Sequence, residues 1–250
     1  MHLRIAHLYP LQMNIYGDRG NILTLVQRCR WRGIKVEVDA IDVGQRVDLR
    51  GYDLAFFGGG QDSNQALVAD DFLQFKGPAL TEAVEDGLVV LAICGGYQLM
   101  GRHFLTHTGE ELPGIALFDA WTVAGRKRLI GNVVVEWTDA PEGAAADTLV
   151  GFENHSGRTY LGPGCRPLGR VLIGYGNNAE DGSEGAVYRN AHGCYLHGTL
   201  LPKNPHLADH LIASALRRRH GAEVALAPLD DQLEWAAHHA MVRRLIRGRR

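Results

Sequence analysis

Two continuous apolar runs, each ending in a cluster of glycines, constrain this chain more than any other feature. Residues 53–57 read DLAFF and lead into three glycines, and residues 88–93 read LVVLAI and lead into Cys94 and two glycines. A short apolar run between turn residues is typical of a strand covered on both faces, as in a parallel sheet. A helical pattern at residues 79–86 separates the two runs. The sequence therefore predicts a strand–helix–strand unit of an α/β protein.

The segments around this unit extend the same alternation. Residues 3–8 and 34–38 read as strands, and residues 22–32 read as a helix with Asn21 as its N-cap. The second half contains short strand-like runs between glycine and asparagine turns, at residues 130–137, 149–155, 168–174, 185–189 and 192–198. We therefore expect one domain, residues 1–250, with a Rossmann-like, mostly parallel twisted sheet, flanking helices and antiparallel strands added in the second half.

The end of the chain predicts two helices. The first follows Asn204 as a cap with Pro205 at the first helical position, and the last runs from about Leu229 to Arg247. The last helix carries an apolar stripe: Leu233, Ala236, Ala237, Ala240, Met241 and Leu245. We expect this stripe to pack on the domain itself, and the alternative is that it contacts a partner. Residues 139–147, rich in alanine, glycine and proline, predict an exposed loop.

The overall composition excludes several classes of protein. The formal net charge is −2, from 26 basic and 28 acidic residues, which gives no general affinity for nucleic acid. The sequence contains neither a signal peptide pattern nor an apolar run of membrane-spanning length. Its four cysteines are widely spaced and form no C-x-x-C motif. We therefore expect free thiols and a cytoplasmic protein without a transmembrane segment.

Cys94 is the first candidate catalytic residue, because it lies where a predicted strand meets a predicted helix. A nucleophile on such a sharp turn projects above the edge of the sheet, and the helix N-terminus stabilises its thiolate. The backbone N–H groups of Gly95 and Gly60 would meet at the same edge and could stabilise an oxyanion. The alternative, a cysteine that only fills the core, fits Cys29 and Cys194 better.

A cysteine nucleophile needs a base, and the chain offers 12 histidines. His197 is the best candidate, because it ends the strand-like run AHGCYLHG and a glycine follows it. His155, in FENHSGRT, is the second candidate. The sequence predicts no metal site, because His238 and His239 are adjacent on a helix and cannot face one ion together.

Three stretches together resemble the class I glutamine amidotransferase domain: FFGGGQD, AICGGYQLMG and GCYLHGTLLPKNP. The Tyr-Leu-His-Gly context is similar to the cobyric-acid-synthase-like branch of that family. The stretches YGDRGN and GFENHSGRT narrow the resemblance to the GatD family, the glutaminase subunits of lipid II isoglutaminyl synthases. The resemblance covers nearly the whole chain and implies a Rossmann-like α/β fold, which agrees with the pattern of strands and helices.

The resemblance implies a role for each of six residues. Cys94 attacks the side-chain amide of L-glutamine, and His197 takes the thiol proton and returns it to the leaving ammonia. The remaining residues hold the oxyanion or the substrate: Gly60 and Gly95 as the oxyanion hole, and Gln98 and Arg128 as glutamine-binding residues. Arg128 suits the α-carboxylate because a guanidinium binds a carboxylate with two hydrogen bonds. The neighbouring Arg126 and Lys127 are the alternatives to Arg128.

The chain departs from the family pattern beyond the histidine. Many class I amidotransferases place a glutamate two residues after it as the acid of the triad, and here that position is Thr199. The site then works as a dyad, or the acid comes from elsewhere. Asp18 and Glu153 are the candidates within the chain, and a carboxylate of a partner subunit is the third source. Our hypothesis at this stage is the partner, because that would tie activity to assembly.

The resemblance implies a heterodimer with a MurT-like synthetase of the Mur ligase family. That partner would use ATP to activate the D-glutamate of the lipid II stem peptide, and the ammonia would amidate it in peptidoglycan biosynthesis. The chain has no G-x-x-x-x-G-K-[ST] loop, so ATP activation is expected in the partner, and no cofactor is expected here. Three alternatives remain: a subunit for a cobyrinate-like corrinoid, a cysteine peptidase or chaperone-like hydrolase, and a non-enzymatic binding module.

Overall fold

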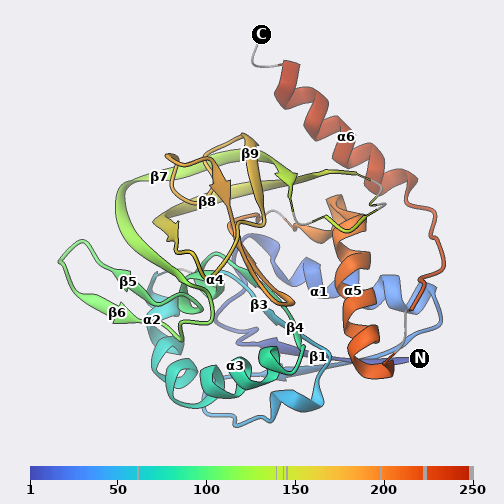
Figure 1. The fold of residues 1–250 in the computed structure, drawn as a ribbon, viewed down its shortest axis with the longest axis horizontal. Coiled ribbons are helices and arrows are strands. Elements are labelled where there is room, and N and C mark those ends of the chain that lie inside the picture. Colours follow the sequence, from blue (N-terminus) through green and yellow to red (C-terminus); the bar gives the residue numbers. More distant parts are fainter. Residues whose placement is uncertain are drawn as a thin grey trace.

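The computed structural model describes residues 1–60, 62–138, 140–142, 144, 146–197, 199–221 and 224–247, and for residues 62–64 and 66 the backbone alone. The chain folds into a mostly parallel sheet with helices beside it and a second, mainly antiparallel sheet stacked against that layer (Figure 1). This confirms the predicted α/β class. The antiparallel strands differ from the prediction in one respect, because most of them form a sheet of their own.

The first sheet has the order β11-β12-β4-β3-β1-β2, and all its pairs are parallel except β11 with β12. Its strands are β1 (His2–Leu8), β2 (Lys35–Ile41), β3 (Leu54–Phe57), β4 (Val89–Ile93), β11 (Ala186–Tyr188) and β12 (Ala191–Cys194). Every residue of β3, β4 and β12 is buried. The apolar runs that predicted covered strands are therefore the centre of the sheet.

The helices lie in two groups beside this sheet (Figure 1). One group, α1 (Arg19–Trp31) and α5 (Pro205–His220), packs on itself and against β1, β2 and β4. The other group contains α2 (Asp62–Asp71), the π-helical turn η3 (Phe72–Lys76) and α3 (Gly77–Glu85). After β1 the chain continues to β2 on one side of it, whereas after β3 it continues to β4 on the opposite side. The direction in which strands are added to the sheet therefore reverses between β1 and β3. Ligands of open α/β sheets bind at such a switch point, beyond the carboxyl ends of the strands.

The second sheet has the order β10-β9-β7-β5-β6, and β8 pairs with β7. Two long strands dominate it, β7 (Ala120–Trp137) and β8 (Thr148–Leu161), with an irregularity in their register between Ala124 and Leu129. Its shorter strands are β5 (His103–Leu105), β6 (Glu111–Pro113), β9 (Gly169–Ile173) and β10 (Ser183–Glu184). An antiparallel bridge from Phe152 of β8 to His197 connects the two sheets at the site described below.

Several local predictions were wrong, for identifiable reasons. Helix α1 follows Asp18 rather than Asn21, and Asn21 is buried with its Oδ1 accepting a hydrogen bond from the Leu201 N–H. Strand β12 ends at Cys194, so the predicted run to residue 198 is too long. Asn204 precedes α5 as predicted, but its side chain bonds to the backbone of Val150 and makes no cap.

Two further predictions concern segments that are partly outside the described residues. The predicted loop at 139–147 includes positions 139, 143 and 145, which lie outside them. The described residues 140–142, 144 and 146 of that segment belong to no strand or helix. The fold also contains three short 3-10 turns, all outside this segment. Those turns are η1 (Ile15–Gly17), η2 (Leu49–Gly51) and η4 (Leu201–Lys203).

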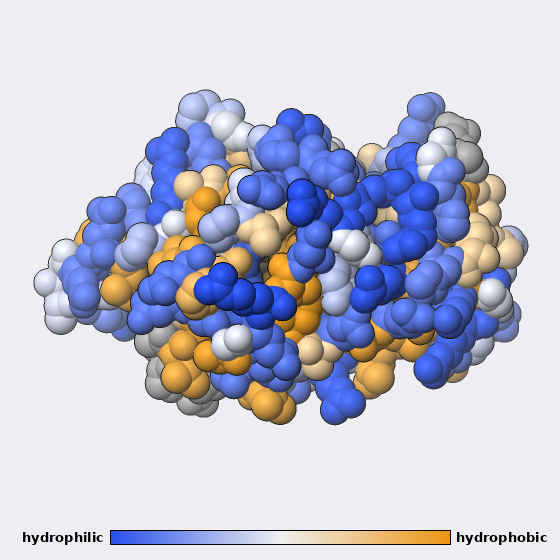
Figure 2. Space-filling view, turned by 90° about the horizontal axis from the view of Figure 1, so that it is seen from below, coloured by the Kyte–Doolittle hydropathy of each residue, from blue (hydrophilic) through white to orange (hydrophobic). Residues whose placement is uncertain are grey.

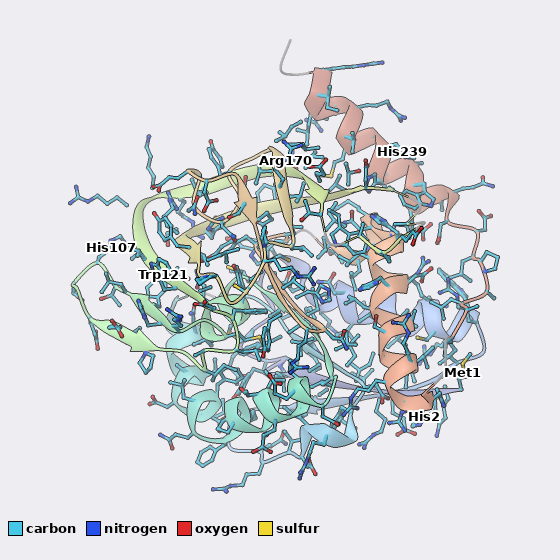
Figure 3. All side chains as sticks on the ribbon, viewed as in Figure 1. Met1, His2, His107, Trp121, Arg170 and His239 are labelled. Carbon is cyan, nitrogen blue, oxygen red and sulfur yellow. The ribbon has the colours of Figure 1, made fainter. Side chains whose placement is uncertain are left out.

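The last helix, α6 (Gln232–Arg247), does not pack as predicted. Leu233 is 83 % exposed, and the three alanines of the predicted stripe are exposed too. The residue that faces the body is His238, which bonds to Thr148 Oγ1 and to the Lys203 carbonyl at 2.9 Å each. Helix α6 extends from the body beyond this anchor, with His239 on its free side (Figures 1 and 3). The face of α6 that points toward the body of the protein therefore contains His238 and not Leu233.

The surface seen from below in Figure 2 is mostly hydrophilic, with hydrophobic residues in separate patches. Among the described helices, none has the length and hydropathy to cross a membrane. All four cysteines are free thiols, and Cys165 is the one that is not buried.

Candidate active site

Cys94 lies between the end of β4 and the start of α4 (Gly95–Leu99). Its backbone has φ 50° and ψ −106°, a conformation that a residue with a side chain rarely adopts. The surrounding structure holds this strained turn, since the Cys94 N–H donates to the Cys194 carbonyl at 2.8 Å. The residue is 8 % exposed, and it lines the cavity described below. The predicted strand-to-helix elbow is therefore present, with a thiol at its tip.

His197 and Asp18 form a buried pair beside this elbow. His197 Nδ1 donates to Asp18 Oδ1 at 3.1 Å, and both side chains have no exposed area. The other ring nitrogen, Nε2, is buried without a hydrogen-bond partner among the described residues, which leaves it available to the Cys94 sulfur. Burial opposes a positive charge on the imidazole, but Cys94 and Asp18 outweigh it and raise the pKa of His197 to about 10. The environment thus favours an imidazolium beside the Cys94 sulfur.

The glycine turn after β3 makes room for this pair. A Cβ on Gly59 would lie 2.7 Å from His197 Cε1, and a Cβ on Gly58 would lie 2.2 Å from the Met13 carbonyl. The Gly59 N–H donates to Asp18 Oδ2 at 2.8 Å. The carboxylate is therefore held from two sides, by the turn after β3 and by the imidazole. Glycine is required here because the loop after β1 and the base pack directly on the backbone.

The two glycines predicted to form an oxyanion hole come together at the Cys94 elbow. A Cβ on Gly95 would lie 3.4 Å from the Gly60 nitrogen, and 3.0 Å from Met13 Cε. Their backbones are therefore close, at the carboxyl edge of β3 and β4. This arrangement is compatible with two N–H groups that face one oxygen atom.

Cys94 opens into a cavity of about 360 Å³. The lining residues come from the loop after β1, the glycine turn, α2, α4 and the second sheet: Ile15, Tyr16, Gly60, Gln65, Cys94, Gln98, Phe104, Arg128, Asn154, His155 and Ser156. Of the three adjacent cations at 126–128, Arg128 is the one on this wall. The cavity therefore brings together Cys94, Gly60, Gln98 and Arg128 of the six predicted site residues, with His197 and Gly95 beside it.

Gln98 is fixed by a chain of polar side chains behind the cavity. Its Nε2 donates to the Tyr195 hydroxyl at 2.9 Å, and that hydroxyl is 2.7 Å from Thr159 Oγ1. The Tyr195 N–H donates in turn to Glu184 at 2.7 Å, and burial raises the pKa of Glu184 to about 8. This bond uses one N–H of Nε2 and fixes the plane of the amide, and Oε1 is the acceptor that Gln98 can offer to a ligand.

His155, the second candidate base, lies on the cavity wall in a different role. Its Nδ1 bonds to the Gly157 carbonyl at 2.8 Å, and its ring stacks on Tyr195 with centroids 3.6 Å apart. Burial lowers the pKa of His155, despite Glu153 nearby. A neutral, stacked imidazole fits the role of a wall residue rather than of the base.

The structure places the two intrachain candidates for the triad acid in different positions. Asp18 is hydrogen-bonded to His197, as described above. Glu153 accepts the N–H groups of Tyr175 and Gly176 at 2.8 and 2.9 Å, so it holds a turn after β9. The carboxylate on His197 therefore comes from this chain, in contrast to our hypothesis of a partner's carboxylate. Gly198, which completes the histidine motif, lies outside the described residues.

Among the cavity residues that sequence reasoning missed, Tyr16 and Asn154 contact predicted site residues. The Tyr16 ring lies edge-on to His197 with centroids 5.1 Å apart, and Asn154 bonds to both Tyr16 and Arg128. The stretches YGDRGN and GFENHSGRT contain them, so the signal was present without an assigned role. Within the described residues, no cluster of three or more histidine, cysteine or acidic side chains could hold a metal ion.

The sequence and the fold both match known proteins. Residues 4–205 match the model of the CobB/CobQ-like glutamine amidotransferase domain. The chain is 41 % identical to the GatD subunit of the glutamine-hydrolysing lipid II isoglutaminyl synthase of Staphylococcus aureus, over 100 % of this chain and 99 % of that protein. It is 40 % identical to the corresponding subunit of Streptococcus pneumoniae, over 92 % and 87 % of the two chains.

Other proteins match this chain at lower sequence identity. A probable cobyric acid synthase of Methanothermobacter thermautotrophicus is 27 % identical over 88 % of this chain, which spans only 46 % of that protein. The fold is similar to a structure of PurLQS from Thermotoga maritima, with a TM-score of 0.58 at 16 % identity, over 87 % of this chain and 99 % of that one. The full-length matches at about 40 % identity decide between these branches. The chain belongs to the CobB/CobQ-like glutamine amidotransferases, in the family of the GatD subunits of lipid II isoglutaminyl synthase.

Proposed function

We propose that this chain hydrolyses L-glutamine to glutamate and ammonia at Cys94. The observation that carries the proposal is the strained Cys94 elbow next to the buried His197–Asp18 pair, in one cavity with Arg128. A thiol, a base and an orienting carboxylate are the groups that nucleophilic acyl transfer requires. Full-length similarity to glutamine-hydrolysing subunits supports glutamine as the substrate.

The proposed reaction has two halves. Because the proton of the thiol already lies on His197 Nε2, the Cys94 sulfur attacks the carbon of the side-chain amide as a thiolate, and the N–H groups of Gly60 and Gly95 bind the oxyanion. The C–N bond then breaks as His197 returns that proton to the departing ammonia, which leaves a γ-glutamyl thioester. In the second half His197 deprotonates a water molecule, which attacks the thioester carbon. The C–S bond then breaks, which releases glutamate and leaves the Cys94 thiolate beside the protonated His197.

The remaining residues position these groups. Asp18 holds the imidazole so that Nε2 faces the sulfur, and it stabilises the imidazolium that forms during each half. Arg128 binds the α-carboxylate of glutamine through two hydrogen bonds. Gln98 offers Oε1 to the substrate, and the bond from its Nε2 to Tyr195 holds the amide in place.

The proposed recipient of the ammonia is a partner subunit. The sequence has no loop for binding ATP phosphates, and the similar proteins are subunits of a synthase. We infer a heterodimer with a MurT-like synthetase that activates the D-glutamate carboxyl of lipid II with ATP. Free thiols and the partner's need for ATP support a reaction in the cytoplasm, with the lipid-linked acceptor at the inner face of the membrane.

Covalent labelling with a glutamine-mimicking diazo-ketone tests the proposed chemistry. We expect one adduct by intact mass on the wild type and on Cys165→Ala, in which the half-exposed thiol is removed. We expect none on Cys94→Ala, and excess L-glutamine should block the adduct. The reaction is run with and without the synthetase subunit. An adduct that persists in Cys94→Ala under both conditions would refute the assignment of the nucleophile.

A further inference from the structure

One asparagine side chain joins the two walls of the cavity. Asn154, on β8, donates from Nδ2 to the Tyr16 hydroxyl at 2.7 Å. Its Oδ1 accepts from Arg128 Nε at 2.9 Å, and its backbone carbonyl accepts from Arg128 Nη2 at 3.1 Å. All three residues line the cavity into which Cys94 opens. The hydrogen bonds therefore form a continuous chain from η1 through β8 to β7.

The Arg128 end of this chain fixes the orientation of a guanidinium. Arg128 is exposed, and an exposed arginine loses rotamer freedom whenever it must bind in one orientation. Two of its five N–H donors are bonded to Asn154, which defines the plane of the group. The free edge of the guanidinium then carries N–H groups of Nη1 and Nη2. That edge has the geometry for a bidentate bond to a carboxylate.

The Tyr16 end reaches the base. Tyr16 has φ 54° within η1, a conformation that a bulky residue adopts only when its surroundings hold it. Its ring packs edge-on against the His197 imidazole. The bond from Asn154 to the hydroxyl keeps the ring on the cavity wall. One amide group thus sets the positions of a residue at the carboxylate end and of a residue at the catalytic end.

We propose that Asn154 is a positioning residue for substrate recognition, which orients Arg128 toward the α-carboxylate of glutamine and holds Tyr16 beside His197. The inference rests on the role proposed above for Arg128. Asn154 itself makes no bond to the substrate in this scheme. It makes the site selective for amides that carry an α-carboxylate, because it places the guanidinium before the substrate arrives.

Selectivity between two substrates tests this inference. Hydrolysis of the side-chain amide is measured for L-glutamine and for L-glutaminamide, in which the α-carboxylate is replaced by a neutral amide. The enzyme is assayed with its synthetase subunit present. In Arg128→Ala we expect the preference for L-glutamine in kcat/KM to fall at least tenfold, and in Asn154→Ala to fall by a similar factor through KM. Asn132→Ala, an exposed asparagine on β7, is the matched control and should keep the wild-type preference.

Two further variants sharpen the test. The double variant Arg128→Ala/Asn154→Ala should be no less selective than Arg128→Ala alone, because Asn154 acts on the selectivity only through Arg128. Tyr16→Phe, which keeps the ring and removes the hydroxyl, should raise KM for both substrates and leave the preference for L-glutamine nearly intact.

The outcomes separate the inference from the proposed function. Equal losses of activity on both substrates in Asn154→Ala would reduce Asn154 to a structural residue and overturn the inference. An unchanged preference in Arg128→Ala would refute the role of Arg128 and the inference with it, while the chemistry at Cys94 would stand. Hydrolysis that survives in Cys94→Ala would refute the proposed function.

Discussion

Asp18 Oδ1 lies 3.1 Å from His197 Nδ1, and protein atoms completely bury both side chains. Asp18 comes from the loop after β1, and His197 follows β12, on the other side of β3 and β4 in the sheet. A charge-assisted bond without contact to water is stronger than the same bond at the surface. This contact therefore orients the proposed base, and together with the Cys94 sulfur it favours the protonated imidazole.

Replacement of Asp18 by asparagine is expected to lower kcat for glutamine hydrolysis by about 10²–10⁴-fold. Asparagine can still accept the Gly59 N–H, but its other end then presents an N–H₂ group to His197 Nδ1 and favours the wrong tautomer. Steady-state ammonia release measures the effect. Asp48→Asn, an exposed carboxylate before η2, is the control and should retain full activity. Near-wild-type kcat in Asp18→Asn would show that the imidazole needs no carboxylate.

The raised pKa of His197 predicts a specific dependence of stability on pH. The value of about 10 in the folded chain lies above the ordinary value of 6.5, so the folded state binds the proton more tightly. This contribution to the free energy of unfolding is fully present below pH 6.5 and is lost as the pH rises through 10. One proton allows a slope of at most about 1.4 kcal/mol per pH unit.

Urea unfolding of the wild type and of His197→Gln between pH 6 and pH 10 isolates this contribution. We expect the stability difference between the two proteins to shrink steadily as the pH rises, because the variant has no proton at this position. Cys94→Ala should show a weaker dependence than the wild type, since the sulfur helps to raise the pKa of His197. A difference that stays constant across this range would contradict the raised pKa.

The close packing around the glycine turn after β3 leaves no room for a side chain at position 59. A methyl group at position 59 would lie 2.7 Å from His197 Cε1 and 3.2 Å from Asp18 Oδ2, so Gly59→Ala must displace one of them. We expect a loss of about 1–3 kcal/mol in the free energy of unfolding and a loss of activity of at least 10²-fold. Gly131→Ala on β7, where a Cβ meets no heavy atom within 4 Å, should retain activity. Equal activity in the two variants would refute the steric account.

Outside the site, the largest loss of stability is expected from substitution of the buried Arg28. It is 1 % exposed and bonds Asp209 of α5 at 2.7 Å and Asp231, just before α6, at 2.6 Å. Arg28→Ala leaves two carboxylates without this partner, and we expect a loss of about 3–5 kcal/mol in the free energy of unfolding. Arg30→Ala, an exposed residue of the same helix, should change it by less than about 0.5 kcal/mol. Denaturant titration of both variants measures the difference.

The sequence was sufficient for the parts of the site that depend on local pattern. Cys94 and the glycines of the two turns follow directly from apolar runs that end in glycine, because the period of a buried strand and the geometry of a turn are local properties. His197 followed from its motif, although its strand ends earlier than predicted. These residues meet because parallel neighbouring strands end at one edge of the sheet.

The partners of these residues could not be decided from the sequence, because they depend on packing between distant segments. Asp18 was one of three possible sources of a carboxylate, and only the neighbourhood of β1 and β3 places it on His197. The face of α6 was wrong for a similar reason. Helical periodicity identifies apolar positions, but His238 became the anchor because its two ring nitrogens find partners on β8 and η4.

The position of β12 has a consequence for the order in which a newly synthesised chain acquires reactivity. This strand lies between β4 and β11, and the proposed base follows it near the end of the fold. A ribosome releases Cys94 well before His197, so an incomplete chain contains the thiol without its proton acceptor. Under the proposed mechanism, hydrolysis of glutamine therefore requires that this late strand has docked beside β4.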